Sequence, residues 1–393
     1  MNSTYPRIAF CLFGLWMPIA GIAQNATPKP VVIPTDQQAA GDAPADPGPL
    51  AKLSPALTPK DIEAAMSKVA DWQVATGKSR YSRQWTFAAL YRGLLEASAT
   101  TGNPEYRDSV LNMARKYDWK LIDTRFPHAD DEALGWSYLT LYEQQPDAER
   151  LADTKRILDQ LVARPDDPKK LLWWWCDALF MAPPVLAKMS VITKDRKYLD
   201  YMDKEWWEMT AVLYDPAEHL YFRDETFLDK HEKNGKKLFW SRGNGWVLAA
   251  LAQVLQLMPG DYPSRPKYVA QFKDMAAKVR SLQQPDGLWK TGLLDQDAYN
   301  YSEVSGTGFF AYGMAWGINA GILDRKTYLP AVQKAWAGML QHVYQDGRLG
   351  SIQPIGAAPD VFTPSTSYVY GIGAFELAGS ELDRMAKGAK KGK

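Results

Sequence analysis

The sequence has little cysteine, little histidine and almost no excess of charge. Its 393 residues include two cysteines and four histidines, and the formal net charge is +1. A balanced charge produces no large field that would attract nucleic acid or an anionic membrane surface. The histidine and cysteine spacings match no metal-binding motif, and there is no Gly-rich phosphate loop and no Gly-x-Ser-x-Gly elbow. We therefore expect no cofactor, no metal and no nucleic-acid partner.

The N-terminus has the residue order of an export signal. Arg7 precedes an apolar run over residues 8–22, which ends in small residues. This order, in a run shorter than a membrane span, predicts a signal peptide over residues 1–23. Cys11 would be removed with it, so Cys176 would be the mature chain's single cysteine and no intramolecular disulfide could form. We expect a periplasmic or secreted protein with no stable membrane insertion after cleavage.

Composition divides the rest of the chain into three segments. Residues 24–55 are rich in Pro, Ala and Asp and lack helical periodicity, which predicts an unstructured linker. Residues 56–384 show helical periodicity with few alternating strand patterns, which predicts one folded domain. Residues 385–393 are mostly basic or small and predict a basic tail.

Helical segments recur through the folded domain in pairs. The first helix of most pairs carries a charged face, whereas the second is apolar nearly all round, as a buried helix is. Repetition of such a unit predicts an all-α (α/α)6 barrel, a toroid of six hairpins with an inner and an outer ring. A simple helical solenoid is the alternative. The expected helices cover residues 58–76, 84–100, 105–119, 130–144, 148–163, 176–190, 196–213, 244–258, 266–283, 304–320, 327–343 and 367–378.

Two aromatic runs, residues 173–184 and 239–246, each place one ionisable group among Trp rings before an inner helix. In the first run this group is Asp177, whose burial would disfavour its charged form. In the second it is Arg242, which can stack on aromatic faces and still bind a carboxylate through its fork. The pattern predicts a pocket for an anionic sugar. The alternatives are helix capping for Asp177 and an ion pair with a rim aspartate for Arg242.

Further candidates lie where other inner helices begin. Asp130 and Asp131 open one of them, so one would cap the helix and the other would face the mouth as a second carboxylate. His128 could equally contact substrate or cap the helix. Trp246 could stack on a sugar ring or pack in the core, and we favour stacking. The remaining rim candidates are Trp85, Arg223 and Asp224.

Three motifs resemble one known family. They are Trp-Trp-Cys-Asp-Ala-Leu-Phe-Met-Ala-Pro-Pro, Trp-Ser-Arg-Gly-Asn-Gly-Trp and Glu-Val-Ser-Gly-Thr. Over about residues 58–379 the chain resembles glycoside hydrolase family 105, the unsaturated rhamnogalacturonyl hydrolases. The resemblance implies an (α/α)6 catalytic domain. It also implies Asp177 as the acid/base and Trp175 as a pocket ring beside it, with Arg242 and Trp246 holding a uronate. For the second carboxylate we prefer Asp131.

The resemblance also implies a reaction. Family members remove a 4,5-unsaturated uronic acid from the non-reducing end of lyase-generated oligosaccharides. An acid protonates C4 and water adds at C5, so one Asp serves as both acid and base, unlike the carboxylate pair of ordinary glycosidases. This chain departs from some members in having Arg223 and Asp224 where they have a His. The alternatives are an ordinary inverting glycosidase that uses Asp177 and Asp131, and a non-catalytic uronide-binding protein.

Overall fold

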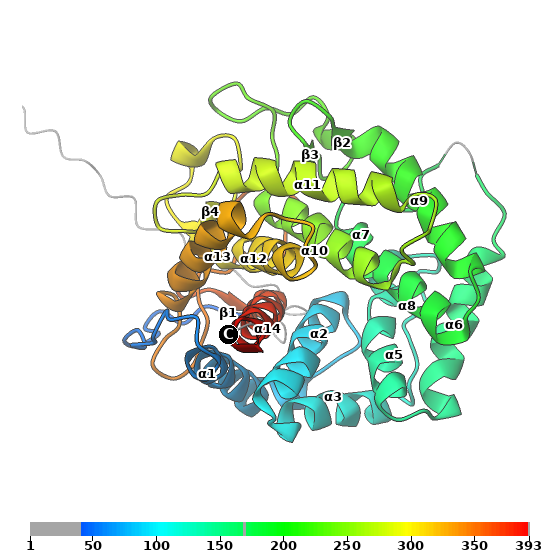
Figure 1. Ribbon diagram of the computed structural model, residues 1–393, viewed down its shortest axis with the longest axis horizontal. Helices are drawn as coiled ribbons and strands as arrows, with labels where there is room; N and C mark the ends of the chain where they lie inside the picture. The colour runs from blue at the N-terminus through cyan, green and yellow to red at the C-terminus, as the bar shows by residue number, and fades with distance from the viewer. Residues whose placement is uncertain (1–40, 168–169, 392–393) are drawn as a thin grey trace, which may run out of the picture. The chain divides into compact units, whose positions relative to one another are not determined.

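Helices arranged in two rings make up most of the structure (Figure 1). The structure is a computed structural model, which describes residues 41–167 and 170–391. The inner helices contact one another in a closed cycle, since each packs against the next and α14 packs against α2. The inner ring comprises α2 (Trp85–Thr101), α5 (Gly135–Gln144), α8 (Pro183–Thr193), α10 (Ser241–Leu257), α12 (Val304–Asn319) and α14 (Val369–Lys391). The outer ring comprises α1 (Pro59–Gly77), α3 (Pro104–Lys116), α6 (Ala148–Val162), α9 (Lys197–Leu213), α11 (Arg265–Ser281) and α13 (Arg325–Leu340). The predicted all-α (α/α)6 barrel is confirmed.

Two predicted inner helices are each broken near their start. The expected helix over 130–144 divides into α4 (Ala129–Glu132) and α5, and the one over 176–190 into α7 (Ala178–Met181) and α8. The second break falls at Pro183, which has no N–H to continue the helical ladder. The two candidate acid clusters therefore lie on separate single turns, α4 and α7, rather than on long helices.

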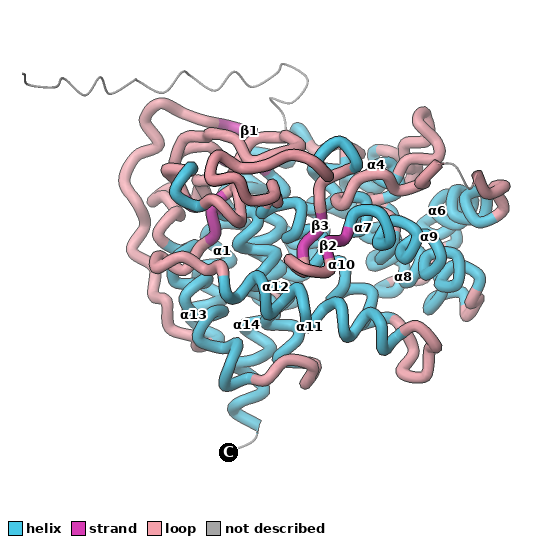
Figure 2. Tube along the Cα trace, turned by 90° about the horizontal axis from the view of Figure 1, so that it is seen from above, coloured by secondary structure: helices cyan, strands magenta, loops and turns pink. Residues whose placement is uncertain are grey.

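Long connections gather at one end of the rings. Apart from the short one between α1 and α2, those that lead from an outer helix into the next inner helix are long, whereas those that lead outward again are short. The inner helices therefore begin at the end where the loops are largest (Figure 2). Three antiparallel strand pairs involve the long connections. β1 (Gly41–Asp42), which precedes α1, pairs with β6 (Ser367–Tyr368), β2 (Tyr214–Asp215) with β3 (Leu220–Tyr221), and β4 (Trp289–Lys290) with β5 (Ser302–Glu303). Single 3-10 turns are η1 (Lys78–Arg80), η2 (Glu225–Phe227) and η3 (Gln296–Ala298).

The ends of the described chain are more ordered than the sequence indicated. The predicted linker includes residues 41–55, yet Gly41 pairs with Tyr368 and the Ala51 N–H donates to the carbonyl of Val343 at 2.8 Å. Short backbone pairing of this kind leaves no hydrophobic periodicity in the sequence, so the sequence did not indicate it. α14 runs to Lys391, so the predicted tail is mostly helix. The predicted signal peptide lies outside the described residues. None of the helices in 41–167 and 170–391 is long and apolar enough to cross a membrane.

Candidate active site

Asp177 is the residue immediately before α7, and its carboxyl is buried. It occupies the N-cap position, but its side chain makes no capping hydrogen bond. Its Oδ2 instead accepts from the thiol of Cys176 at 3.6 Å and lies 3.6 Å from Nε of Arg223. Burial raises the pKa of Asp177, although the charges of Arg223 and Arg242 act to lower it. The capping interpretation therefore does not account for this side chain, which can hold a proton beside a cation.

Asp130 and Asp131 both lie near Arg125, but only Asp131 is hydrogen-bonded to it, since Oδ2 of Asp130 lies 3.9 Å from Nη1 of Arg125. Asp131 is buried, and Nε of Arg125 donates to its two oxygens at 3.1 and 3.2 Å. Asp130 lies 3.8 Å from Nδ1 of His128. Burial, opposed by Arg125 and reinforced by the charge of Asp177, raises the pKa of Asp130 to about 7. This arrangement differs from our preference for Asp131, because Asp130 is the carboxyl coupled to Asp177 whereas Asp131 is occupied by an ion pair.

Arg223 joins the carboxyl of Asp177 to an exposed indole. Its Nη1 donates to Oδ2 of Asp224 at 2.7 Å, and its guanidinium lies 5.4 Å from the centre of the Trp174 ring. Its backbone is tied to the acid-bearing segment, because the Cys176 N–H donates to the Arg223 carbonyl at 2.8 Å. Its Nε makes no hydrogen bond. A fixed cation that has N–H donors beyond the one bound to Asp224 is suited to bind an anionic group of a ligand.

The neighbouring aromatic rings divide into one exposed and one buried indole. Trp174 is 46% exposed and Trp175 only 4%. The Trp175 ring packs between Trp174 and His128, with ring centres 4.7 and 4.8 Å apart. Burial lowers the pKa of His128. Trp174 therefore offers the open ring face, and we had not singled it out because three consecutive Trp residues do not reveal which one turns outward.

Arg242 does not present a free fork to a ligand. It is 1% exposed, and Nη1 and Nη2 donate to the carbonyls of Gln353 and Pro354, each at 2.7 Å. Its guanidinium lies 4.4 Å from the centre of the Trp240 ring and 4.7 Å from that of Tyr370. The expected contact with a uronate is therefore replaced by an anchor for the loop at 353–354, and Arg242 influences Asp177 through its charge.

Trp246 is a core residue. It is fully buried, with ring centres of Phe309 and Phe180 at 4.1 and 4.7 Å. The ring offers no open face for a sugar in this structure, although its buried Nε1 makes no hydrogen bond, and the expected stacking stays a prediction. Trp85, which is half-buried, packs edge-on against Trp246 and stacks on Tyr370 at 5.7 Å. The large apolar residues of α7, α10 and α12 meet here, which explains the burial of Trp246.

The glycines of the Arg-Gly-Asn-Gly segment serve packing between helices. A side chain at Gly243 would come within 3.1 Å of the sulfur of Cys176, and one at Gly245 within 3.3 Å of the backbone of Gly306. They therefore allow α10 to approach α7 and α12 closely, rather than allowing a ligand to approach the backbone.

Asn244, which we had not singled out, holds the segment that carries Arg223. Its amide exchanges two hydrogen bonds with the backbone of Tyr221, at 2.8 and 3.0 Å, and donates to the carbonyl of Trp240 at 3.0 Å. Arg223 and Asp224 come shortly after Tyr221 in the chain, so the hydrogen bonds of Asn244 fix the position of the backbone that leads into them. The sequence feature that could have indicated this role is an amide side chain between two glycines at the start of a buried helix.

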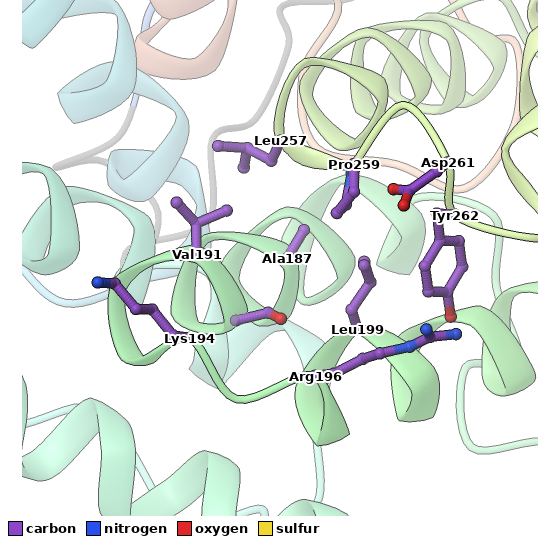
Figure 3. Close-up of a pocket in the computed structure, with 10 residues that line it drawn as sticks. Ala187, Val191, Lys194, Arg196, Leu199, Leu257, Pro259, Asp261 and Tyr262 are labelled. Atoms are coloured by element: carbon purple, nitrogen blue, oxygen red, sulfur yellow. The ribbon is translucent and has the colours of Figure 1, made fainter.

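A cavity of about 330 Å³ lies away from the candidate acids Asp130 and Asp177 (Figure 3). It is lined by the C-terminal end of α8, the start of α9 and the segment after α10, including Val191, Lys194 and Tyr262. Asp177 and Arg242 lie at the opposite ends of the segments that form it. Within 41–167 and 170–391, no group of three His, Cys, Asp or Glu side chains could hold a metal ion.

Two coupled carboxyls and an arginine beside indole rings lie at the loop end of the (α/α)6 barrel, an arrangement compatible with a glycoside hydrolase. Comparison with known proteins gives its family. The family model for Glycosyl Hydrolase Family 88 matches residues 59–386, and the chain belongs to this family. The resemblance to unsaturated uronyl hydrolases is thereby confirmed. The family model that matches the chain is described as family 88.

Relatives and solved structures agree with this assignment. The chain is 42% identical to an unsaturated 3S-rhamnoglycuronyl hydrolase of Formosa agariphila, over 83% of this chain and 91% of that protein. It is 35% identical to an unsaturated 3S-rhamnoglycuronyl hydrolase of Alteromonas sp., over 82% and 87% of the two chains. A solved family 88 glycosyl hydrolase from Bacteroides vulgatus superposes with a TM-score of 0.78 and 32% identity, over 83% of this chain and 99% of that one.

Proposed function

We propose that this protein removes a 4,5-unsaturated uronic acid from the non-reducing end of lyase-generated oligosaccharides by hydration of the vinyl ether. The observation that carries the proposal is the buried carboxyl of Asp177, whose pKa is raised although Nε of Arg223 lies 3.6 Å away. A carboxyl whose pKa is raised keeps its proton to a higher pH than an ordinary Asp, so it can act as a general acid, and a neighbouring cation can hold an anionic substrate. An unsaturated uronide has both a double bond that accepts a proton and a carboxylate that binds a cation, in one sugar ring.

The reaction begins with proton transfer from Asp177 to C4 of the unsaturated ring, which leaves an oxocarbenium ion at C5. Water then adds at C5 and returns a proton to the Asp177 carboxylate, so the acid is regenerated. The C5 hemiketal opens to a ketone, and the exposed C1 hemiacetal expels the next sugar. One water molecule is consumed and no second carboxylate is needed as nucleophile, in contrast to a retaining glycosidase.

The other site residues have supporting roles in this proposal. The guanidinium of Arg223, whose side chain is 18% exposed, binds the uronate carboxylate. Asp130, with a pKa of about 7, and His128 bind ring hydroxyl groups. Trp174 supplies an exposed ring face for a sugar, because pyranose faces pack well against indole. Trp175 keeps the carboxyl of Asp177 away from water.

The proposal includes a substrate class and a location. The two relatives named above are unsaturated rhamnoglycuronyl hydrolases, which supports a substrate in which the uronate is joined to rhamnose. Residues 1–23 support export to the periplasm or the medium. N-terminal sequencing of the protein from fractionated cells tests export, with a mature terminus near residue 24 expected. An intact Met1 on the cytoplasmic protein would contradict it.

The activity is tested by ultraviolet absorbance, which the conjugated enoate gives and the hydrated product lacks. We expect absorbance to fall when the protein is incubated with lyase products of uronate–rhamnose polysaccharides or rhamnogalacturonan. Intact polysaccharide should give no change. A rise in absorbance from intact polysaccharide would identify a lyase, release of reducing sugar without loss of the enoate would identify an ordinary glycosidase, and tight binding without turnover would identify a binding protein. Any of these three results refutes the proposal.

A further inference from the structure

Arg92, in the middle of α2, carries a buried positive charge for which the mechanism above has no use. The residue is 1% exposed, and burial lowers the pKa of its guanidinium to about 9, which leaves it charged at neutral pH. Its Nη1 donates to Oε1 of Gln253 at 2.8 Å, and its guanidinium lies 4.2 Å from the ring centre of Phe180 and 5.1 Å from that of Trp136. No carboxylate is among its hydrogen-bond acceptors in the described chain. A buried charge without a counterion is costly, so its surroundings have to compensate for it.

That compensation comes from the two turns that carry the candidate acids. Nη2 of Arg92 donates to the carbonyl of Ala133, at the end of α4, and to that of Met181, at the end of α7, at 3.3 and 3.2 Å. Asp130 lies in α4, and Asp177 immediately precedes α7. One NH2 group thus joins the C-terminal ends of two turns whose N-terminal ends carry the coupled carboxyls.

The two turns are short and in contact with each other. Each has four residues and leads through helical residues, Ala133 and Leu134 or Ala182, into the longer helix α5 or α8. Their last carbonyls have no partner within the helix and need donors from elsewhere. We propose that Arg92 is a positioning residue, which sets the separation of Asp130 and Asp177 by joining the C-terminal ends of α4 and α7.

The proposal rests on the proposed function, because it concerns the same acids. The charge of Asp177 is one cause of the raised pKa of Asp130, so this coupling depends on their separation. Proton transfer is also sensitive to position, and a misplacement of about 1 Å can cost on the order of a hundredfold in rate. A residue that sets this separation therefore affects both kcat and the pH profile.

Two substitutions at Arg92 test the proposal. Arg92→Lys keeps a basic group, but it lacks the planar fork that spans Gln253 and both carbonyls. We expect kcat to fall about tenfold with KM nearly unchanged, and the pKa of Asp130 to fall because the two turns move apart. Arg92→Met removes the charge and all the donors, and should lower kcat further. A change in the distance between Asp130 and Asp177 in Arg92→Lys distinguishes an effect of geometry from the loss of a cation, because a buried lysine can lose its proton.

Arg150 provides a matched control. It is also buried, donates to the carbonyl of Leu141 at 3.0 Å and to Oε1 of Gln145 at 3.2 Å, and lies 5.1 Å from the Trp119 ring centre. It thus binds the end of α5, not a turn that carries an acid. Arg150→Lys should lower Tm and leave kcat and the pH profile unchanged. If Arg92→Lys also lowers only Tm, Arg92 is structural and the proposal is wrong.

A readout that does not depend on turnover separates this inference from the proposed function. Titration of ¹³C-labelled Asp carboxyls reports the pKa of Asp130 in the wild type and in Arg92→Lys, and a crystal structure of Arg92→Lys reports its distance from Asp177. If the wild type does not hydrate unsaturated uronides, the proposed function fails. A lower Asp130 pKa and a longer distance would still support the positioning role, and unchanged values would overturn it.

Discussion

Arg223 approaches Asp177 without forming a short hydrogen bond to it. Its Nε lies 3.6 Å from Oδ2 of Asp177, while its Nη1 donates to Asp224 at 2.7 Å. The cation therefore lowers the pKa of Asp177 without overcoming the effect of burial, which still raises it. Asp224 holds the guanidinium in place, so Asp177 stays free to exchange a proton with a ligand.

Replacement of Arg223 should move the pH profile and weaken binding. Arg223 acts to lower the pKa of Asp177, so Arg223→Gln should raise that pKa further. Because the reaction starts from protonated Asp177, the alkaline limb of kcat should shift to higher pH. Loss of the contact with the uronate should raise KM by about tenfold or more, the equivalent of about 1.4 kcal/mol. An alkaline limb at unchanged or lower pH would show that Arg223 does not act on Asp177 in this way.

Replacement of Asp177 separates its catalytic role from its effect on stability. Asp177→Asn should reduce kcat on the order of a thousandfold or more, because both proton transfer and alignment are lost. Burial raises the pKa of Asp177 in the folded protein, so its ionised form destabilises the fold at high pH. The variant should therefore unfold at a higher temperature than the wild type above neutral pH, with no gain in strong acid. Wild-type turnover in the folded variant would exclude Asp177 as the acid.

Asp130 and Asp131 should respond differently to the same substitution. Asp130→Asn should reduce kcat and remove a titration near pH 7, with Tm at neutral pH retained or raised, because ionisation of this buried carboxyl is unfavourable. Asp131→Asn instead breaks the ion pair with the half-exposed Arg125 and should lower stability by about 1 kcal/mol, with kcat in the same order of magnitude as the wild type. Parallel kinetics and thermal melts decide between them. The reverse result would restore Asp131 as the second carboxylate.

Helical periodicity was sufficient to predict the barrel, but not the breaks in it. The sequence pattern located all six hairpins, because a repeated pair of one amphipathic and one apolar helix has few alternative packings. It did not show that α4 and α7 are separate turns. This division depends on a proline for α7 and, for both turns, on tertiary contacts such as those of Arg92.

The sequence motifs include residues that the structure brings together, but they do not show what each one contacts. Asp177 and Arg223, which lie in different segments, are neighbours in the structure. Arg242 differs because its acceptors are carbonyls more than one hundred residues away, at 353 and 354. The choice between Asp130 and Asp131 likewise depends on Arg125, which the aromatic motifs do not include. Long-range partners of this kind leave no mark on the local pattern.

The two tryptophans Trp174 and Trp246 should have opposite effects when truncated. Trp174 is largely exposed beside Arg223, so Trp174→Ala should raise KM about tenfold through lost stacking and leave Tm close to that of the wild type. Trp246 is fully buried against Phe309 and Phe180, so Trp246→Ala should cost about 3–5 kcal/mol of stability. Trp246→Phe retains most of the ring and serves as the milder variant, with KM near that of the wild type. A large rise in KM for Trp246→Phe at unchanged Tm would return this ring to the substrate-binding set.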